Sequence, residues 1–375
     1  METSKVYFTN MRTKLGESLL TKMERLIVKA GIKDIDFKRK YTAIKIHFGE
    51  PGNLSFLRPN FAKTVVDRIK SLGGMPFLTD CNTLYAGRRN HALNHLDAAN
   101  ENGFYPLSTG CQNIIADGIR GIDDIEVPIK NGEFCKTAHI GRAIMDADIV
   151  VSLNHFKAHE ETGIGGVLKN IGMGCGSRAG KMAMHNDTKP LVNSGHCIGC
   201  RICARFCAHD AISFSGGKAS IDSKKCAGCG RCIGACSKNA IYTKADSAWA
   251  AVGCKMAEYA SAVLEGRPNF HITVVNQVSP FCDCHGENDV AIVPDIGIFA
   301  SFDPVALDKA CIDAVNAAPA MPNSILDERQ HTHKDESGNA DHVIDIHPGT
   351  DWRIQLAHAE KIGLGSAKYE LITIE

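Results

Sequence analysis

The apolar run ADIVVSLN, residues 147–154, has the composition of a fully buried β-strand. Strands that are buried on both faces belong mainly to parallel sheets covered by helices. Upstream, YTAIKIHF (41–48) alternates in polarity and MPFLTD (75–80) follows a pair of glycines, so both predict further strands. Between them, apolar residues at helical spacing predict a helix at 61–72.

The rest of the chain continues this alternation of strands and helices. Further strands are expected at 271–279, 289–295 and 369–374. Further helices are expected at 19–30, 91–101, 138–146, 246–265, 304–316 and 351–361. The alternation predicts an α/β domain with a largely parallel sheet. Because patterned sequence lies on both sides of a cysteine-rich stretch, we expect this domain to be split into 1–189 and 246–375 by an insertion at 190–245.

The chain has sixteen cysteines, and half of them lie in the expected insertion. They form two runs of the pattern C-x2-C-x2-C-x3-C, namely Cys197, Cys200, Cys203 and Cys207, then Cys226, Cys229, Cys232 and Cys236. This repeat is the bacterial ferredoxin signature for two [4Fe–4S] clusters, and it predicts an inserted α+β ferredoxin-like domain. Since the fourth cysteine of each run ligates the other cluster, the predicted ligands are Cys197, Cys200, Cys203 and Cys236 for the first cluster, and Cys226, Cys229, Cys232 and Cys207 for the second. Zinc ribbons are the alternative, but their C-x2-C pairs are separated by longer loops.

Charge and composition narrow the expected partners. The chain carries 42 basic and 42 acidic residues, so nothing global indicates nucleic acid or membrane binding. The opening METSKVYFTN has no apolar signal-peptide core, and many cysteines without a secretion signal favour a cytoplasmic location. The stretch 190–244 has eight basic residues and two acidic ones, which suits an acidic redox partner protein or a small anionic substrate. An ordinary solvated surface explains this charge equally well.

A second candidate site follows the apolar run 147–154. Ligands of open α/β sheets bind outside the carboxyl ends of the strands. We therefore expect a functional site in HFKAHEETGIGGVLK (155–169), with Glu160 nearby and with these catalytic residues: His155, Lys157, His159 and Lys169. The glycines at 163, 165, 166 and 172 are expected to let the backbone approach a ligand closely. The alternative is a glycine-rich loop with solvated charges.

The triplet Cys282-x-Cys284-His285 brings together thiol and imidazole ligands. Such ligands suit zinc, iron or copper(I), so the triplet is a candidate site for a further transition metal. His159 or Cys175 would complete its shell. Buried free cysteines are the alternative.

Three more residues are expected near strand ends at the same crevice: Cys81, Asp295 and Asp303, with Asp80 beside the first. Asp303 precedes Pro304 and so also has the pattern of a helix N-cap. Neither ATP nor NAD is expected. Gly180-Lys181 is followed by Met182 and so is not a Walker A loop, and the glycines at 163–166 do not complete a dinucleotide fingerprint.

Four blocks outside the insertion resemble a widespread prokaryotic family, domain of unknown function 362. They are KIHFGEPGNLSFLRP (45–59), DCNTLY (80–85), ADIVVSLNHFKAHEETGIGGVLKNIGMGCGSRAGK (147–181) and FCDCHGENDVAIVPDIGIFASFDPVALDKAC (281–311). Members that carry this ferredoxin insert are called uncharacterised Fe–S centre proteins. The resemblance covers nearly the whole chain and implies an Fe–S protein of anaerobic or facultative prokaryotes, without an assigned reaction.

A remoter likeness concerns the run from His159 to Lys169. Its pattern, H-x2-TG-x-GG-x2-K, is similar to the H-x3-G-x-x-GG-x-K stretch of nickel-pincer lactate racemases. That likeness implies a lysine to which a cofactor is attached and a histidine that acts as ligand or base. Lys169 departs from the pattern by one residue in its spacing from the glycines.

Three functions are compatible with these features. In a redox enzyme, the clusters would exchange electrons with a site near 155–169 and 282–285, where Lys157 and Lys169 or a metal bind a small anionic substrate. In a non-catalytic carrier or adaptor, the α/β domain would dock a partner oxidoreductase. In a delivery protein, clusters or metal would pass to an apo-protein. A diffusing carrier has no need of so large a second domain, which favours the enzyme.

Overall fold

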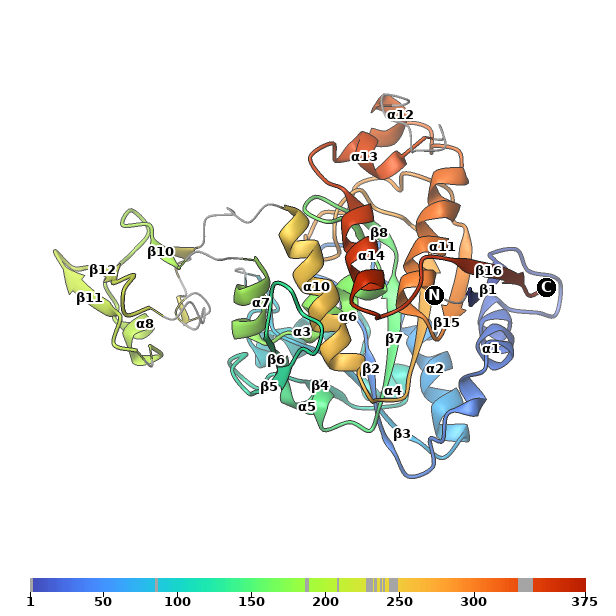
Figure 1. The fold of residues 1–375 in the computed structure, drawn as a ribbon, viewed down its shortest axis with the longest axis horizontal. Coiled ribbons are helices and arrows are strands. Elements are labelled where there is room, and N and C mark those ends of the chain that lie inside the picture. The colour runs from blue at the N-terminus through green and yellow to red at the C-terminus, as the bar shows by residue number, and fades with distance from the viewer. Residues whose placement is uncertain are drawn as a thin grey trace.

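A mixed eight-stranded β-sheet forms the centre of the molecule (Figure 1). The computed structural model describes residues 3–84, 87–185, 189–207, 209–226, 232, 235–236, 238, 240–242, 249–329 and 340–375. The strands follow one another in the order β16 (Tyr369–Thr373), β1 (Ser4–Asn10), β15 (Gly297–Ser301), β14 (Asn269–Val275), β7 (Ile149–His155), β2 (Tyr41–Lys45), β3 (Met75–Asp80) and β4 (Asn113–Ile115). The strands from β14 to β4 are parallel, β1 and β16 are parallel to each other, and β15 is antiparallel to both neighbours. The prediction of an α/β fold with a largely parallel sheet is confirmed.

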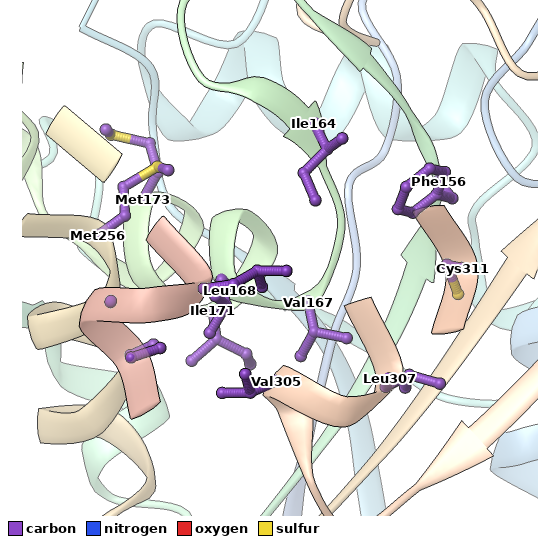
Figure 2. Packing of buried hydrophobic residues seen from close by; sticks show 14 of the residues in the cluster. Phe156, Ile164, Val167, Leu168, Ile171, Met173, Met256, Val305, Leu307 and Cys311 are labelled. Atoms are coloured by element: carbon purple, nitrogen blue, oxygen red, sulfur yellow. The ribbon is translucent and has the colours of Figure 1, made fainter. Parts of the chain in front are cut away.

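The central strand β7 is buried along its whole length because helices cover both faces of the sheet. Successive side chains of a strand point to opposite faces. Val151 and Leu153 enter a core that α1 (Leu19–Lys29) and α2 (Pro59–Ser71) close. Val150 enters the opposite core, closed by α6 (Val167–Cys175), α10 (Trp249–Leu264) and α11 (Pro304–Ala317). Figure 2 shows Leu168 of α6 and Val305 of α11 in this second core.

Shorter elements surround the sheet. A hairpin of β8 (Lys157–His159) and β9 (Gly163–Gly165) directly follows β7. The others are η1 (Ile32–Asp34), α3 (Ala92–Glu101), α4 (Pro106–Thr109), α12 (Ile325–Arg329), α13 (His342–Ile346) and α14 (Trp352–Lys361). In the part of the chain that the structure describes, no helix is both long enough and apolar enough to cross a bilayer.

Two predicted elements are wrong. Residues 289–295 form no strand, and Ile292 and Val293 instead enter the core from a loop. Pro294 has no N–H to donate to a ladder, and β15, which the sequence does not predict, takes the place in the sheet. Only the second half of the expected helix at 138–146 is helical, as the short α5 (Arg142–Met145); the first half belongs to the strand β6 (Thr137–Gly141), which pairs with β5 (Asp124–Pro128). A Cβ at Gly141 would lie 2.6 Å from Cys81 Sγ, so this segment is fixed by a close tertiary contact that local pattern does not reveal.

The cysteine-rich segment follows α7 (Arg178–His185) and precedes α10 in the chain, and it lies apart from the large sheet (Figure 1). Within it, β10 (Leu191–Val192) pairs with β13 (Ile241–Tyr242), and β11 (Ile212–Ser215) pairs with β12 (Lys218–Ile221). One short helix, α8 (Ile202–Arg205), is described there. None of these described strands joins the eight-stranded sheet. Strands from both sides of the segment share that sheet, so the chain leaves the α/β fold after α7 and returns to it at α10.

Candidate functional site

A cavity of about 500 Å³ opens at the carboxyl ends of β2, β3 and β7. Lys45 ends β2, Asp80 ends β3 and Lys157 follows β7, and all three side chains line the cavity. Lys169 of α6 and Met256 of α10 form part of its wall. This is the position at which open α/β sheets bind ligands.

Most residues predicted at this crevice line the cavity: Cys81, Lys157, His159, Glu160, Lys169, Cys284 and His285. Cys175 is buried outside the lining, and its carbonyl accepts a hydrogen bond from Cys81 Sγ. Asp295 and Asp303 lie elsewhere. Asp303 Oδ1 caps α11 by accepting from the first amides of the helix, as its pattern predicts, and Asp295 accepts from the Gln277 amide.

His155 does not line the cavity, but it contacts Asp283 next to the cavity residues Lys157 and Cys284. Its Nδ1 lies 2.9 Å from Asp283 Oδ1, and its Nε2 lies 2.8 Å from the Asn276 carbonyl. Lys157 Nζ donates to the other oxygen of Asp283 at 2.9 Å. Burial opposes the charge of Asp283, but His155 and Lys157 outweigh it and hold the pKa of this carboxyl well below its usual range. The Asp283 carboxylate therefore anchors the loop that carries Cys282 and Cys284.

Two thiols and one ammonium form a compact group: Lys169 and Cys284 line the cavity, and Cys282 is buried beside them. Cys282 Sγ lies 2.9 Å from Cys284 Sγ and 2.8 Å from Lys169 Nζ. Cys284 Sγ lies 3.6 Å from His47 Nε2. Burial raises the pKa of the Cys282 thiol, but the hydrogen bond from Cys284 and the charges of Lys169 and Lys157 lower it to about 6. Cys282 is thus a thiolate at neutral pH, neutralised by an ammonium.

His285 is not brought to the two thiols as the metal prediction expects. Its Nε2 lies 2.6 Å from Glu160 Oε1, an interaction that raises the pKa of His285. Among the described residues, no three His, Cys, Asp or Glu side chains are grouped so that they could hold a metal ion. Cys282 and Cys284 are the two predicted ligands that the structure places together.

His159 presents an N–H group to the cavity, and not a lone pair. Its Nδ1 accepts from the backbone amides of Glu161, at 3.1 Å, and Thr162, at 3.3 Å. In a neutral ring the proton then lies on Nε2. Burial and the charge of Lys169 lower the pKa of His159 to about 4, which keeps the ring neutral. The ring is therefore a hydrogen-bond donor, and this tautomer does not suit a metal ligand.

The glycines near α6 serve packing within the protein. A Cβ at Gly166 would lie 2.1 Å from Asp308 Oδ1, and one at Gly172 would lie 2.1 Å from the Met256 carbonyl. Asp308 uses the space at Gly166 to accept from the first two amides of α6. Gly166 lines the cavity, as expected of a glycine that lets the backbone approach a ligand, whereas the space at Gly172 is filled by the Met256 carbonyl.

Several cavity residues are not predicted from the sequence: Lys45, His47, Glu50, Arg89, Lys181 and His185. Lys45 Nζ lies 2.9 Å from Asp80 Oδ1, and Arg89 Nε lies 2.9 Å from Glu50 Oε2. Lys45 lies within the predicted strand 41–48 and ends β2, so the expectation that ligands bind at the carboxyl ends of strands could have identified it. Arg89 lies in a loop with no such signal, and its contacts with Glu50 and Asp80 are tertiary.

A separate, smaller pocket lies in the cysteine-rich segment and is lined by Cys197, Cys200, Cys203 and Cys236. Three of these come from the first run and one from the second. Backbone amides point at the sulfurs: Ala219 N lies 3.4 Å from Cys197 Sγ, and Ala240 N lies 3.3 Å from Cys236 Sγ. At Gly199 (φ +67°) a Cβ would lie 2.1 Å from the Gly217 carbonyl, so a glycine is needed for this turn.

The remaining four cysteines of the two runs are described in part. Cys229 lies outside the described residues, while Cys207, Cys226 and Cys232 are described. Ala211 N lies 3.4 Å from Cys207 Sγ, which repeats the contact between Ala240 and Cys236 four residues apart. Next to Cys207, the Phe206 ring lies 4.3 Å from the guanidinium of Arg120 in the α/β fold.

Comparison with solved structures gives distant likenesses, among them the two that follow. A Thermotoga maritima protein shares 12% identity over 79% of this chain and 58% of its own, with a TM-score of 0.39. The lactate racemase apoprotein from Thermoanaerobacterium thermosaccharolyticum shares 10% identity over 99% of this chain and 83% of its own, with a TM-score of 0.40. Likeness at this level says nothing about the chemistry of the site. This chain spans little more than half of the Thermotoga protein.

The sequence itself gives a firmer relationship. No functionally curated protein matches the chain. The family model described as domain of unknown function (DUF362) matches residues 42–313, which include the cavity loops and the cysteine-rich segment. The chain therefore belongs to the DUF362 family.

Proposed function

We propose that this protein is an iron–sulfur redox protein in which two [4Fe–4S] clusters in the cysteine-rich segment exchange electrons with a ligand bound in the cavity. When bound, such clusters supply one-electron transfer. Cys197, Cys200, Cys203 and Cys236 would hold the first cluster, and Cys226, Cys229, Cys232 and Cys207 the second.

The observation that carries the proposal is which cysteines line the small pocket of the cysteine-rich segment. Cys236 belongs to the second run, yet it lines one pocket with three cysteines of the first. That exchange of the fourth ligand is the arrangement expected of a two-cluster ferredoxin, and separate zinc ribbons would not produce it. Amide groups directed at Cys197 and Cys236 favour thiolates at these positions.

The point of insertion links the segment to the cavity. Helix α7 precedes the segment and contributes Lys181 and His185 to the cavity wall. Helix α10 follows it and contributes Val252 and Met256. Both ends of the segment therefore join elements of the cavity, and the Arg120–Phe206 contact adds a further attachment.

The cavity favours an enzyme over the two alternatives. An electron carrier or a delivery protein needs a docking surface, whereas a 500 Å³ cavity has the size of a site for a small molecule. Lys169 and Cys284 line the cavity and supply functional groups of this chain at that site, with Cys282 buried beside them. A second metal at Cys282 and Cys284 remains part of the proposal, to be decided by metal analysis.

The test is metal and sulfide analysis of protein prepared without oxygen, together with EPR of the reduced protein. We expect about eight iron atoms and about eight sulfides per chain. Cys236→Ser should lose about half of the iron, whereas Cys135→Ala, a change at a half-buried cysteine of the α/β fold, should lose none. Zinc in place of iron, or full iron in Cys236→Ser, would refute the proposal. If a further metal is present, Cys282→Ser with Cys284→Ser should remove that metal alone.

A further inference from the structure

We infer that the cavity binds a small molecule through an oxyanion group, a carboxylate or a phosphate, with Lys181 as the cationic anchor and His159 as a neutral donor. Lys181 is only 7% exposed, and it lines the cavity from the first half of α7. Its Nζ donates to the Gly176 carbonyl at 2.5 Å. An ammonium has three N–H donors, so this bond leaves donors for a ligand.

The other basic side chains of the cavity are already neutralised. Lys45 is paired with Asp80, Arg89 with Glu50 and Lys157 with Asp283, and Lys169 Nζ lies 2.8 Å from Cys282 Sγ. Within the described ranges, no carboxylate lies within 4.0 Å of Lys181 Nζ. The nearest counter-charge in effect is the buried carboxyl of Asp117: burial raises the pKa of Asp117 to about 6, and the charge of Lys181 opposes that rise. A buried cation without a counter-ion in direct contact is costly, and an anionic ligand reduces that cost.

This assignment corrects the sequence-based expectation that Lys157 and Lys169 bind the anion. Asp283 holds Lys157 at 2.9 Å, and Cys282 holds Lys169 at 2.8 Å, so both charges act within the protein. Lys181 enters the sequence argument only as part of a failed Walker A pattern. Its role follows from the placement of α7 against the cavity, which the sequence does not show.

His159 adds a donor with a fixed orientation. Its Nδ1 accepts from the amides of Glu161 and Thr162, so Nε2 carries the proton. His185 lies one turn after Lys181 on α7 and lines the same cavity, with Nδ1 3.5 Å from Glu161 Oε2. An ammonium together with a neutral N–H donor matches the needs of an oxyanion.

The size and the contents of the cavity define the ligand further. A volume of about 500 Å³ suits a metabolite and is too small for a macromolecule. Cys284 lines the same cavity, so the rest of a ligand held at Lys181 shares the space with the thiol group. The identification of this ligand as a redox substrate rests on the proposed function, whereas the binding itself does not.

Calorimetric titration of the full-length protein, prepared without oxygen and of known iron content, tests the inference. The probes are succinate and inorganic phosphate, each in a separate arm that assigns the oxyanion as carboxylate or phosphate. We expect at least one to bind, and Lys181→Met to weaken that binding by roughly tenfold or more because a charged hydrogen bond is lost. Lys309→Met, at a lysine paired with Asp313, should leave the affinity unchanged.

Two results would overturn the inference: no binding of either probe, or unchanged affinity in Lys181→Met. If the methionine variant fails to fold, Lys181→Gln keeps a donor toward the Gly176 carbonyl while it removes the charge, and the same loss of affinity is expected. Iron content and EPR separate the two proposals. Anion binding by a protein that has no clusters would leave this inference standing and refute the proposed function.

Discussion

The molecule contains two groups of cysteines whose surroundings differ in kind. In the cysteine-rich segment, sulfurs accept hydrogen bonds from backbone amides such as Ala219 N and Ala240 N. In the cavity, Cys282 and Cys284 face each other, and charged or ring nitrogen atoms of Lys169 and His47 surround them. Main-chain N–H donors cannot be titrated, and they leave the sulfur free to bind a metal ion. An ammonium beside the sulfur instead occupies the position that a metal ion would take.

Cysteine therefore lies in two chemically different environments in this molecule. Amides from Ala219 and Gly199 are the main causes that lower the pKa of Cys197, and the charge of Lys218 adds a smaller effect. In the cavity, Lys169 lowers the pKa of Cys282 against the effect of burial. The first environment suits four thiolates around one inorganic cluster, and the second suits a single thiolate that stays reactive toward a ligand.

The largest effect is expected from crowding the cysteine-lined pocket. Gly199→Ala introduces a Cβ that would lie 2.1 Å from the Gly217 carbonyl, in a turn that carries Cys197 and Cys200. We expect the first cluster to be lost and iron to fall by about half. Gly216→Ala is the matched control, because Gly216 also has a positive φ but has no atom within 4 Å of its added Cβ. Equal iron in both variants would show that this turn does not shape a cluster site.

The next effect concerns the anchor behind the cavity thiols. Asp283→Asn removes the charge that holds His155 and Lys157, and Lys157 is then a buried cation without its partner. Breaking a buried ion pair from one side costs about 3–5 kcal/mol in the free energy of unfolding. Denaturant unfolding would measure this loss, and Asp289→Asn, at an exposed position of the same loop, should change stability by less than about 0.5 kcal/mol. Similar stability of the two variants would mean that Asp283 does not anchor the loop.

The two groups of cysteines also differ in how far sequence reasoning reaches them. The spacing of the two runs predicts which cysteines belong together, and Cys236 lines one pocket with Cys197, Cys200 and Cys203. Spacing is informative there because the cysteines of each run are close in sequence. In the cavity, His47, Lys169 and Cys284 meet from three distant segments, so only the order of strands in the sheet brings them together.

The fold, too, is predictable from the sequence where the local pattern decides the element, and not where distant contacts decide it. β7 and β3 are predictable because their apolar runs are buried by layers on both faces. β15 is missed because the apolar stretch before it, 289–295, has the stronger pattern but contains Pro294. His285 is assigned to metal from its neighbours in sequence, whereas its partner is Glu160, which lies 125 positions away.

A smaller effect is expected at the Cys282 thiol itself. With a pKa of about 6, alkylation of the Cys282–Cys284 peptide by iodoacetamide should rise with pH up to about pH 7 and then level off, because the thiolate is the reacting form. Lys169→Met removes a nearby charge, so the pH of half-maximal rate should move upward by roughly one unit or more. Mass spectrometry of the labelled peptide measures the rate.

The control for this shift is Lys309→Met, in which a lysine that is paired with Asp313 is removed away from the cavity. Its pH profile should match that of the unchanged protein. A profile of Lys169→Met that coincides with the unchanged protein would show that the cavity thiols, like those of the segment, do not depend mainly on a side-chain charge. The comparison between the two groups of cysteines would then fail.

The smallest effect is expected at His285, at the rim of the cavity. The hydrogen bond that His285 Nε2 donates to the Glu160 carboxylate raises the pKa of His285, and partial exposure weakens the interaction. Glu160→Gln should lower the pKa of His285 by roughly half a unit to one unit, so the ring loses its proton at a lower pH. Glu287→Gln, whose carboxylate is 4.0 Å from the ring and largely exposed, should shift it less. NMR titration of the ring protons measures both shifts. If instead Glu160→Gln leaves the titration unchanged and added Zn²⁺ abolishes it, then His285 belongs with Cys282 and Cys284 as a metal ligand, and the cavity sulfurs resemble those of the segment more than their contacts indicate.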